Sequence, residues 1–220
     1  MSDLARTQER DGEAKEWTVR AVLALQSPRA VFAALRDDSP AAAAARSEPV
    51  LALVLLAGMA LLLLTPEAGN VMDSSDYDGM VFAIWLFIVG GVMGAAVYWA
   101  VGAILYGATS WLGSLGSYRR ARHLVGYALA PLALSLVLVL PLRLAFFGGD
   151  AFRSGGADSG TRGLVVALLG WAFFGWSVVL AVLGVRAVHA WTWQRALAAS
   201  GLVAALVGAV ALVETLLRHA

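Results

Sequence analysis

Residues 80–112 form a run of 33 residues that contains no charged side chain. A helix on the surface of a soluble protein carries a polar face, so this run predicts a helix surrounded by apolar material. As a straight helix it would measure about 50 Å, whereas the hydrocarbon core of a bilayer is about 30 Å thick. We therefore expect one membrane-spanning helix that tilts, kinks or projects beyond the lipid.

Four further apolar runs accompany this long one. A transmembrane helix needs about 20 mostly apolar residues. The first run, residues 50–64, is shorter and ends at Thr65-Pro66, so its helix would need its flanks to cross a bilayer. The remaining runs are residues 124–142, 163–185 and 196–213. The sequence thus predicts an all-α integral membrane protein, a bundle of five transmembrane helices preceded by short amphipathic cytoplasmic helices.

The composition supports a membrane protein. Hydrophobic residues make up 60% of the chain and charged residues 14%, against about 45–50% and 25% in soluble domains. The chain contains no cysteine, which excludes disulfides, thiolate metal sites and thiol nucleophiles. Fifteen of the 16 basic residues are arginine, which is typical of a GC-rich bacterial genome.

The chain before the first span divides into two parts. Residues 1–16 alternate charges with little apolar surface and predict a disordered tail. Residues 17–48 predict short amphipathic helices and a linker, with Ser27-Pro28 starting one helix. These helices either lie in the headgroup region or pack on the end of the bundle. Residues 1–48 lack the apolar core of a signal peptide, so we expect the first span of the domain at 49–220 to act as an uncleaved anchor.

The arginines and the lysine predict the orientation. Segments 1–48, 113–123 and 186–195 hold twelve of the 16 basic residues, and the first loop on the opposite side is purely acidic. Cytoplasmic loops are enriched in Lys and Arg. We therefore expect a multi-pass protein of the cell inner membrane with its N-terminus in the cytoplasm and its C-terminus outside.

Two features indicate contacts with lipid or with other proteins. The connector at 113–123 carries Arg119, Arg120 and Arg122, which hold it in the cytoplasm and are candidates to bind anionic headgroups or an acidic partner. Gly90 and Gly94 have the spacing that lets two helices approach closely. The expected partners are the lipid bilayer, an unidentified membrane or cytoplasmic protein and a second copy of the chain. We expect no nucleic acid.

Catalysis has little support in the residue pattern. Ser114 or Ser117 with His123 or His189 is conceivable as a nucleophile and base, but no carboxylate is placed to orient the histidine. We therefore predict no enzyme, no catalytic residues and no cofactor.

A metal site is also not expected. An acidic loop at 67–78 lacks the glycine and the distal glutamate of a calcium-binding loop, so it is interpreted as a solvated loop.

A small-solute transporter or channel is the alternative function. Pro131 and Pro141 lie in the third span, and broken helices often mark transport sites. Polar side chains near that span would line a path: Tyr98, Tyr106, Tyr127 and Ser135. The absence of a charged residue in mid-membrane argues against ion coupling.

The connector and its surroundings resemble the Yip1 domain family. The shared features are Gly113, Gly116, Tyr127 and Pro131 within the stretch G-S-L-G-S-Y-R to V-G-Y-A…P, together with His123, an upstream Ser27-Pro28 followed by Phe32, and a late helix from Trp176 to Arg186. The resemblance covers about residues 19–213.

This resemblance implies a five-helix membrane domain with a cytoplasmic N-terminus, of the bacterial type. Eukaryotic members act in vesicle trafficking and bind Rab-type GTPases, but their Asp-Leu-Tyr-Gly-Pro motif does not occur in this sequence. We accordingly expect a non-enzymatic membrane protein that organises membrane or protein partners through its cytoplasmic face.

Overall fold

The computed structural model describes residues 19–219 except residues 21, 75–77, 154 and 159. The tail predicted at 1–16 lies outside the described residues. All regular structure in the described part is helical. Its elements are α2 (Pro28–Ala34), α3 (Pro40–Ala45), α4 (Ser47–Leu62), α5 (Glu67–Met72), α6 (Gly79–Trp111), α7 (Tyr118–Ala128), α8 (Ala130–Phe147), the 3-10 turn η1 (Gly148–Asp150), α9 (Thr161–His189) and α10 (Trp193–His219).

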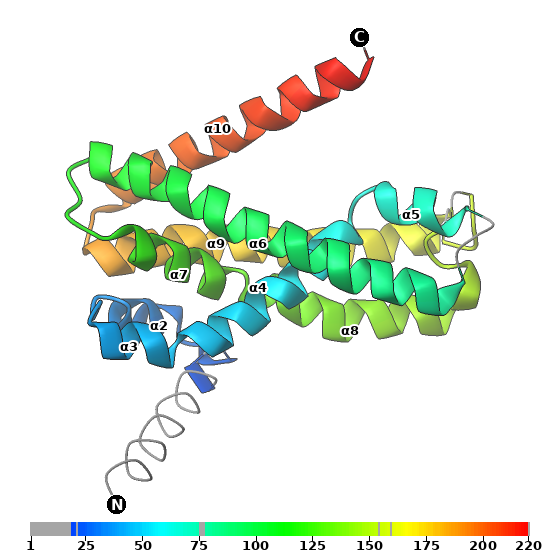
Figure 1. Ribbon diagram of the computed structural model, residues 1–220, viewed down its shortest axis with the longest axis horizontal. Helices are drawn as coiled ribbons and strands as arrows, with labels where there is room; N and C mark the ends of the chain where they lie inside the picture. Colours follow the sequence, from blue (N-terminus) through cyan, green and yellow to red (C-terminus); the bar gives the residue numbers. More distant parts are fainter. Residues whose placement is uncertain (1–18, 21, 75–77, 154, 159, 220) are drawn as a thin grey trace, which may run out of the picture.

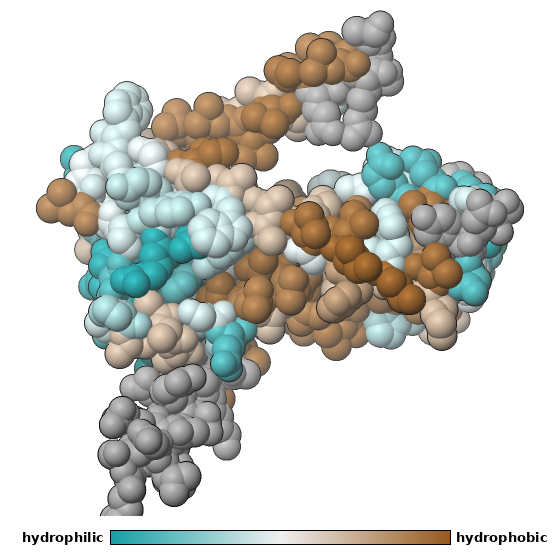
Figure 2. Space-filling view, viewed as in Figure 1, coloured by the Kyte–Doolittle hydropathy of each residue, from teal (hydrophilic) through white to brown (hydrophobic). Residues whose placement is uncertain are grey.

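Five helical segments are long and apolar enough to cross a membrane, as the sequence predicts. They are Pro40–Leu62, Gly79–Trp111, Tyr118–Asp150, Thr161–His189 and Trp193–Leu217. Figure 2 shows an apolar band between two more hydrophilic ends. The charge-free run at 80–112 belongs to one unbroken helix, α6.

Two segments interpreted as linker or loop are helical, and those interpretations are wrong. The stretch before the first apolar run forms α3, because five consecutive alanines are strong helix formers and Ser39 caps them by accepting a hydrogen bond from the Ala42 N–H at 3.3 Å. The first span therefore extends back to Pro40. Part of the acidic loop forms α5.

The third span consists of two helices that join at Leu129. Pro131, which has no N–H to donate, lies in the first turn of α8. The Leu132 N–H donates instead to the Ser177 hydroxyl of α9 at 3.2 Å. A side chain of the neighbouring helix thus accepts from a backbone N–H at the break. Inside a membrane, backbone groups freed by a helix break need such partners.

Glycines bring α4 and α6 into direct backbone contact. A Cβ atom added to Gly94 would lie 2.1 Å from the Val54 carbonyl oxygen, and one added to Gly58 would lie 2.1 Å from the Gly90 carbonyl oxygen. This face of α6 is covered by α4 of the same chain. It is therefore not available to a second copy.

The spans α6, α8 and α9 run along the bundle, α4 crosses them obliquely and packs on α6 and α8, and α10 leaves the bundle at an angle (Figure 1). The short helices α2 and α3 lie at the same end as α7 and the turn between α9 and α10. We call this end, where these elements meet, the arginine-rich end. The opposite end is formed by α5, in the connection between α4 and α6, and by η1, in the connection between α8 and α9.

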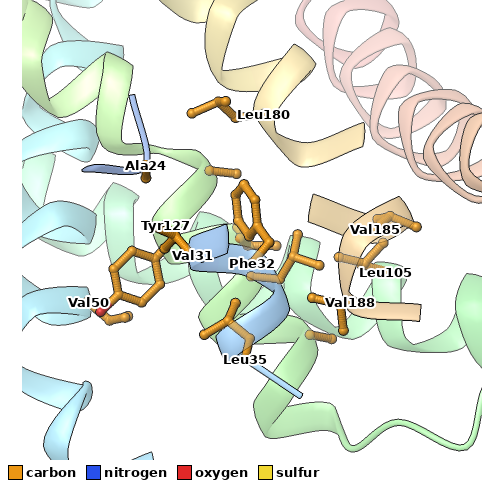
Figure 3. Packing of buried hydrophobic residues seen from close by; sticks show 14 of the residues in the cluster. Ala24, Val31, Phe32, Leu35, Val50, Leu105, Tyr127, Leu180, Val185 and Val188 are labelled. Atoms are coloured by element: carbon orange, nitrogen blue, oxygen red, sulfur yellow. The ribbon is translucent and has the colours of Figure 1, made fainter. Parts of the chain in front are cut away.

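Helix α2 packs into the arginine-rich end of the bundle rather than lying apart from it. Phe32 and Leu35 are completely buried, and they share one apolar cluster with Tyr127, Val185 and Val188 (Figure 3). A Cβ atom added to Gly184 of α9 would lie 3.0 Å from the Phe32 ring. Of the two placements that the sequence leaves open, the structure has the packed one.

Candidate functional site

A fully buried arginine lies at the centre of the arginine-rich end. Arg46, between α3 and α4, has no exposed surface. Its Nε donates to His123 Nδ1 at 2.8 Å, Nη1 donates to the Asp37 carbonyl oxygen at 2.8 Å, and Nη2 lies 3.3 Å from Asp38 Oδ1. A guanidinium keeps its charge and needs acceptors when it is removed from water. These partners hold the chain between α2 and α4 against α7.

Asp38 links this buried arginine to the connector. Its carboxylate accepts from the Ser117 hydroxyl and forms ion pairs with Arg46 and with Arg119 Nε, the latter at 3.2 Å. Burial alone would raise the pKa of Asp38, but the hydrogen bonds from Ser117 and Arg119 outweigh it and hold that pKa below the usual range. Ser117 also caps α7 by accepting from the Arg120 N–H at 3.0 Å.

The three connector arginines expected to contact lipid or a partner all have contacts within the chain. Arg119 Nη2 donates to the Asp38 carbonyl oxygen at 2.7 Å, and Arg120 Nη2 donates to the Arg36 carbonyl oxygen at 2.9 Å. The guanidinium of Arg122 lies 3.7 Å from the centre of the Trp99 ring, a cation–π arrangement. Among the three, Arg119 keeps 40% of its side chain exposed.

The four positions that carry the family resemblance lie in or beside the connector. Gly113 has φ +88, a left-handed conformation that suits glycine and ends α6. Gly116 lies against His189, with only 3.3 Å from its added Cβ to the ring. Tyr127 is fully buried in the cluster around α2, and Pro131 opens α8. These residues shape the turn and the start of the third span.

Of the serine–histidine combinations considered, the structure brings together Ser114 and His189. Ser114 Oγ lies 3.1 Å from His189 Nδ1 and accepts from the Gly116 N–H at 3.0 Å. The imidazole stacks on Trp191 with 4.7 Å between ring centres. The described part of the chain shows no carboxylate in contact with this ring, and the adjoining cavity has a volume of only about 10 Å³.

Ser117 and His123 each bond to a different residue. Ser117 bonds to Asp38 and His123 bonds to Arg46. Among the described residues, no group of three His, Asp or Glu side chains is placed to hold a metal ion. Asp76 of the acidic loop lies outside the described residues, and Asp78 caps α6 by accepting from the Val81 N–H at 2.8 Å.

A cavity of about 300 Å³ lies in the opposite half of the bundle, between α4, α8 and α9. Ser135 and Arg143 line it, together with apolar residues such as Leu136 and Trp171. Arg143 is paired with Asp158 and lies 3.8 Å from the centre of the Phe152 ring. Ser135 donates to its own helix, at the Leu132 carbonyl oxygen, 2.6 Å away.

Sequence reasoning missed Arg46 and Asp38, the centre of the network. One signal was present: Arg46 directly follows five alanines and, with Ser47 and Glu48, separates them from the apolar run at 50–64, where a charge is costly without partners. Asp37 and Asp38 are near in the sequence, but the partner on α7, His123, lies 77 positions away along the chain. No spacing in the sequence connects the two.

Five helices that are long and apolar enough to cross a membrane define a polytopic helical membrane protein. The pattern of the Yip1 domain family matches residues 22–213, so the chain belongs to that family. The Yip1 domain family is a family of non-enzymatic membrane proteins. No curated protein and no solved structure gives a match.

Proposed function

We propose that this protein is a non-enzymatic protein of the cell inner membrane that organises membrane or protein partners through its arginine-rich end. The observation that carries this proposal is the network of Arg46, His123, Asp38, Ser117 and Arg119. It joins α2, α3 and the connector into one preformed surface. A surface that is already ordered loses less conformational entropy when a partner binds.

This surface lies in the cytoplasm in our proposal, since basic residues collect on that side of membrane proteins. The chain has no cysteine, so single cysteines are informative reporters. Leu115 is 102% exposed in the connector, and Gly149 is exposed at the opposite end. A membrane-impermeant maleimide should label Gly149→Cys in spheroplasts and label Leu115→Cys only after lysis. The reverse pattern would contradict the orientation.

Contact with partners is tested by a photo-crosslinker at Leu115, with the same group at Phe146 as the control near the other end, where the side chain is 68% exposed. We expect defined adducts from Leu115 that decrease when Arg119 is replaced by glutamine. Arg119 is the suitable change because 40% of its side chain is exposed. Equal adducts at both positions, or adducts insensitive to Arg119→Gln, would contradict the proposal.

Ser114 and His189 act as a link between the connector and α9 in this proposal, because the pair has no orienting carboxylate and no substrate-sized cavity. A fluorophosphonate probe for serine nucleophiles should leave the purified protein unlabelled. Labelling that disappears in Ser114→Ala would instead establish a nucleophilic serine.

The cavity of about 300 Å³ favours the alternative, a small-solute transporter or channel. Along α9, however, the cavity is lined only by residues between 166 and 171, while the buried cluster with Leu180 and Val185 fills the arginine-rich end. Proteoliposome flux over a panel of small solutes distinguishes the two functions. Flux that is blocked by Ser135→Trp would favour the alternative.

A further inference from the structure

A second group of arginines lies outside the network described above, in a groove between α2 and the end of α9. The groove has a volume of about 290 Å³, and we call it the arginine groove. Its lining includes Arg29, Arg36, Arg186, Leu183, Ala187 and Trp191. No carboxylate lines it among the described residues. Three guanidiniums around one hollow produce a positive field that attracts an anion.

The three arginines differ in how much of their hydrogen-bonding capacity is used. Arg36 Nε donates to the Ala187 and Val188 carbonyl oxygens at 3.1 and 3.3 Å. These carbonyls lie in the last turn of α9, where no helical N–H follows to bond them. The Arg186 guanidinium lies 4.3 Å from the centre of the Trp193 ring, and its buried Nε makes no hydrogen bond within the described chain. Arg29 is exposed on α2. Arg29 and Arg186 therefore retain donors for a ligand.

We propose that the arginine groove binds the phosphate group of an anionic phospholipid. Guanidiniums pair with phosphate oxygens through charge-assisted hydrogen bonds, frequently two at a time. The volume is at the small end of the range for ligand sites, which suits a headgroup.

The position of the groove selects a lipid over a free phosphate. It lies where the fourth span ends and the fifth begins, since Arg186 is in the last turn of α9 and Trp193 begins α10. Trp191 and Trp193 have the placement of interfacial tryptophans, which lie at headgroup depth. Leu183 adds an apolar wall. The inference depends on the membrane-spanning bundle and not on the partner contacts proposed above.

The test is native mass spectrometry of the full chain in detergent, with phosphatidylglycerol, with phosphatidylcholine of the same acyl chains, and with glycerol 3-phosphate. We expect the wild-type chain to retain phosphatidylglycerol preferentially. Arg29→Gln combined with Arg186→Gln should weaken that binding about tenfold or more, because hydrogen bonds to charged groups are lost. Arg29→Lys, which keeps the charge but cannot pair with two phosphate oxygens through a planar fork, should lose less affinity than Arg29→Gln.

Arg195→Gln is the matched control, because Arg195 is exposed at the same end but does not line the groove. It should change the affinity less than about twofold. An equal loss in Arg195→Gln and Arg29→Gln would show unspecific attraction and overturn the site. Equal retention of phosphatidylcholine, or glycerol 3-phosphate binding as tight as that of the lipid, would overturn the lipid assignment. Arg29→Gln alone, an exposed change, keeps the test valid if Arg186→Gln does not fold.

Discussion

Arg46 donates from Nε to Nδ1 of His123 at 2.8 Å, and both side chains are buried. Because a guanidinium offers only donors, Nδ1 of His123 must accept, and the ring proton lies on Nε2. The pair fastens the start of the first span to the third span. The Arg46 charge can be buried because His123, the Asp37 carbonyl and Asp38 accept hydrogen bonds from its guanidinium at the arginine-rich end.

Replacing His123 by leucine should destabilise the protein by about 3 kcal/mol, because a buried guanidinium nitrogen would lose its acceptor. Asparagine at the same position keeps an acceptor oxygen and should restore part of the loss. Thermal unfolding of the purified protein in detergent measures both. Leu115→Ala, at a fully exposed position, serves as the control and should leave the melting temperature unchanged. A His123→Leu protein as stable as the wild type would show that Arg46 finds another acceptor.

Asp38 should contribute stability that depends on pH. Its pKa lies below the usual value in the folded state, so the folded state is favoured above about pH 4 and this contribution is lost as the pH falls through the lowered pKa. Asp38→Asn should cost about 2 kcal/mol at pH 7, with a difference from the wild type that shrinks in acid. Unfolding measured between pH 3 and pH 7 tests this.

The neighbouring Asp37 provides the control for that measurement. Its pKa is also lowered, chiefly by the backbone hydrogen bond from Ser39, but the carboxylate is exposed. Asparagine retains an acceptor for that bond, so Asp37→Asn should have little effect. Equal losses from the two changes would contradict the role of Asp38 in the network.

Gly94→Ala should destabilise the bundle by about 3 kcal/mol or more, because the new Cβ would meet the Val54 carbonyl oxygen at 2.1 Å and would force α4 and α6 apart. Gly107→Ala, in the same helix, meets nothing within 4 Å and should be neutral or stabilising by up to about 1 kcal/mol. Thermal unfolding of the two variants provides the comparison. Similar melting temperatures for Gly94→Ala and Gly107→Ala would show that α4 and α6 can move apart without loss of stability, which would contradict the prediction.

Ser177→Ala should cost about 1–3 kcal/mol, because the buried Leu132 N–H at the break of the third span would lose its acceptor. Ser135→Ala is the matched change, since that hydroxyl donates to a carbonyl of its own helix, whose oxygen still accepts within the helix, and its loss should cost less. Hydrogen exchange at Leu132 should accelerate in Ser177→Ala alone. Unchanged protection there would mean that water replaces the hydroxyl.

Most of the secondary structure of the spans could be predicted from residue type alone, since apolar runs of sufficient length partition into lipid as helices. The errors fell at the polar ends. The alanines after Pro40 fall within the stretch at 17–48 that the sequence assigns in part to a linker, yet Ser39-Pro40 caps and starts a helix there. For the connector arginines, the sequence shows where the charges lie along the chain. It does not show the backbone carbonyls that accept their hydrogen bonds or the aromatic ring that Arg122 contacts.

Local composition and short motifs are enough to predict the number of spans and the family, although the first and third spans extend beyond their apolar runs. Which charges form pairs follows from the packing of the helices. Asp38 pairs with Arg119, 81 positions away, and Arg36 caps α9, 151 positions away. Such pairs depend on how the helices pack, because a buried charge takes whichever partner the fold brings within hydrogen-bond distance. Tertiary packing likewise placed Phe32 on Gly184 and left the arginine groove between α2 and α9.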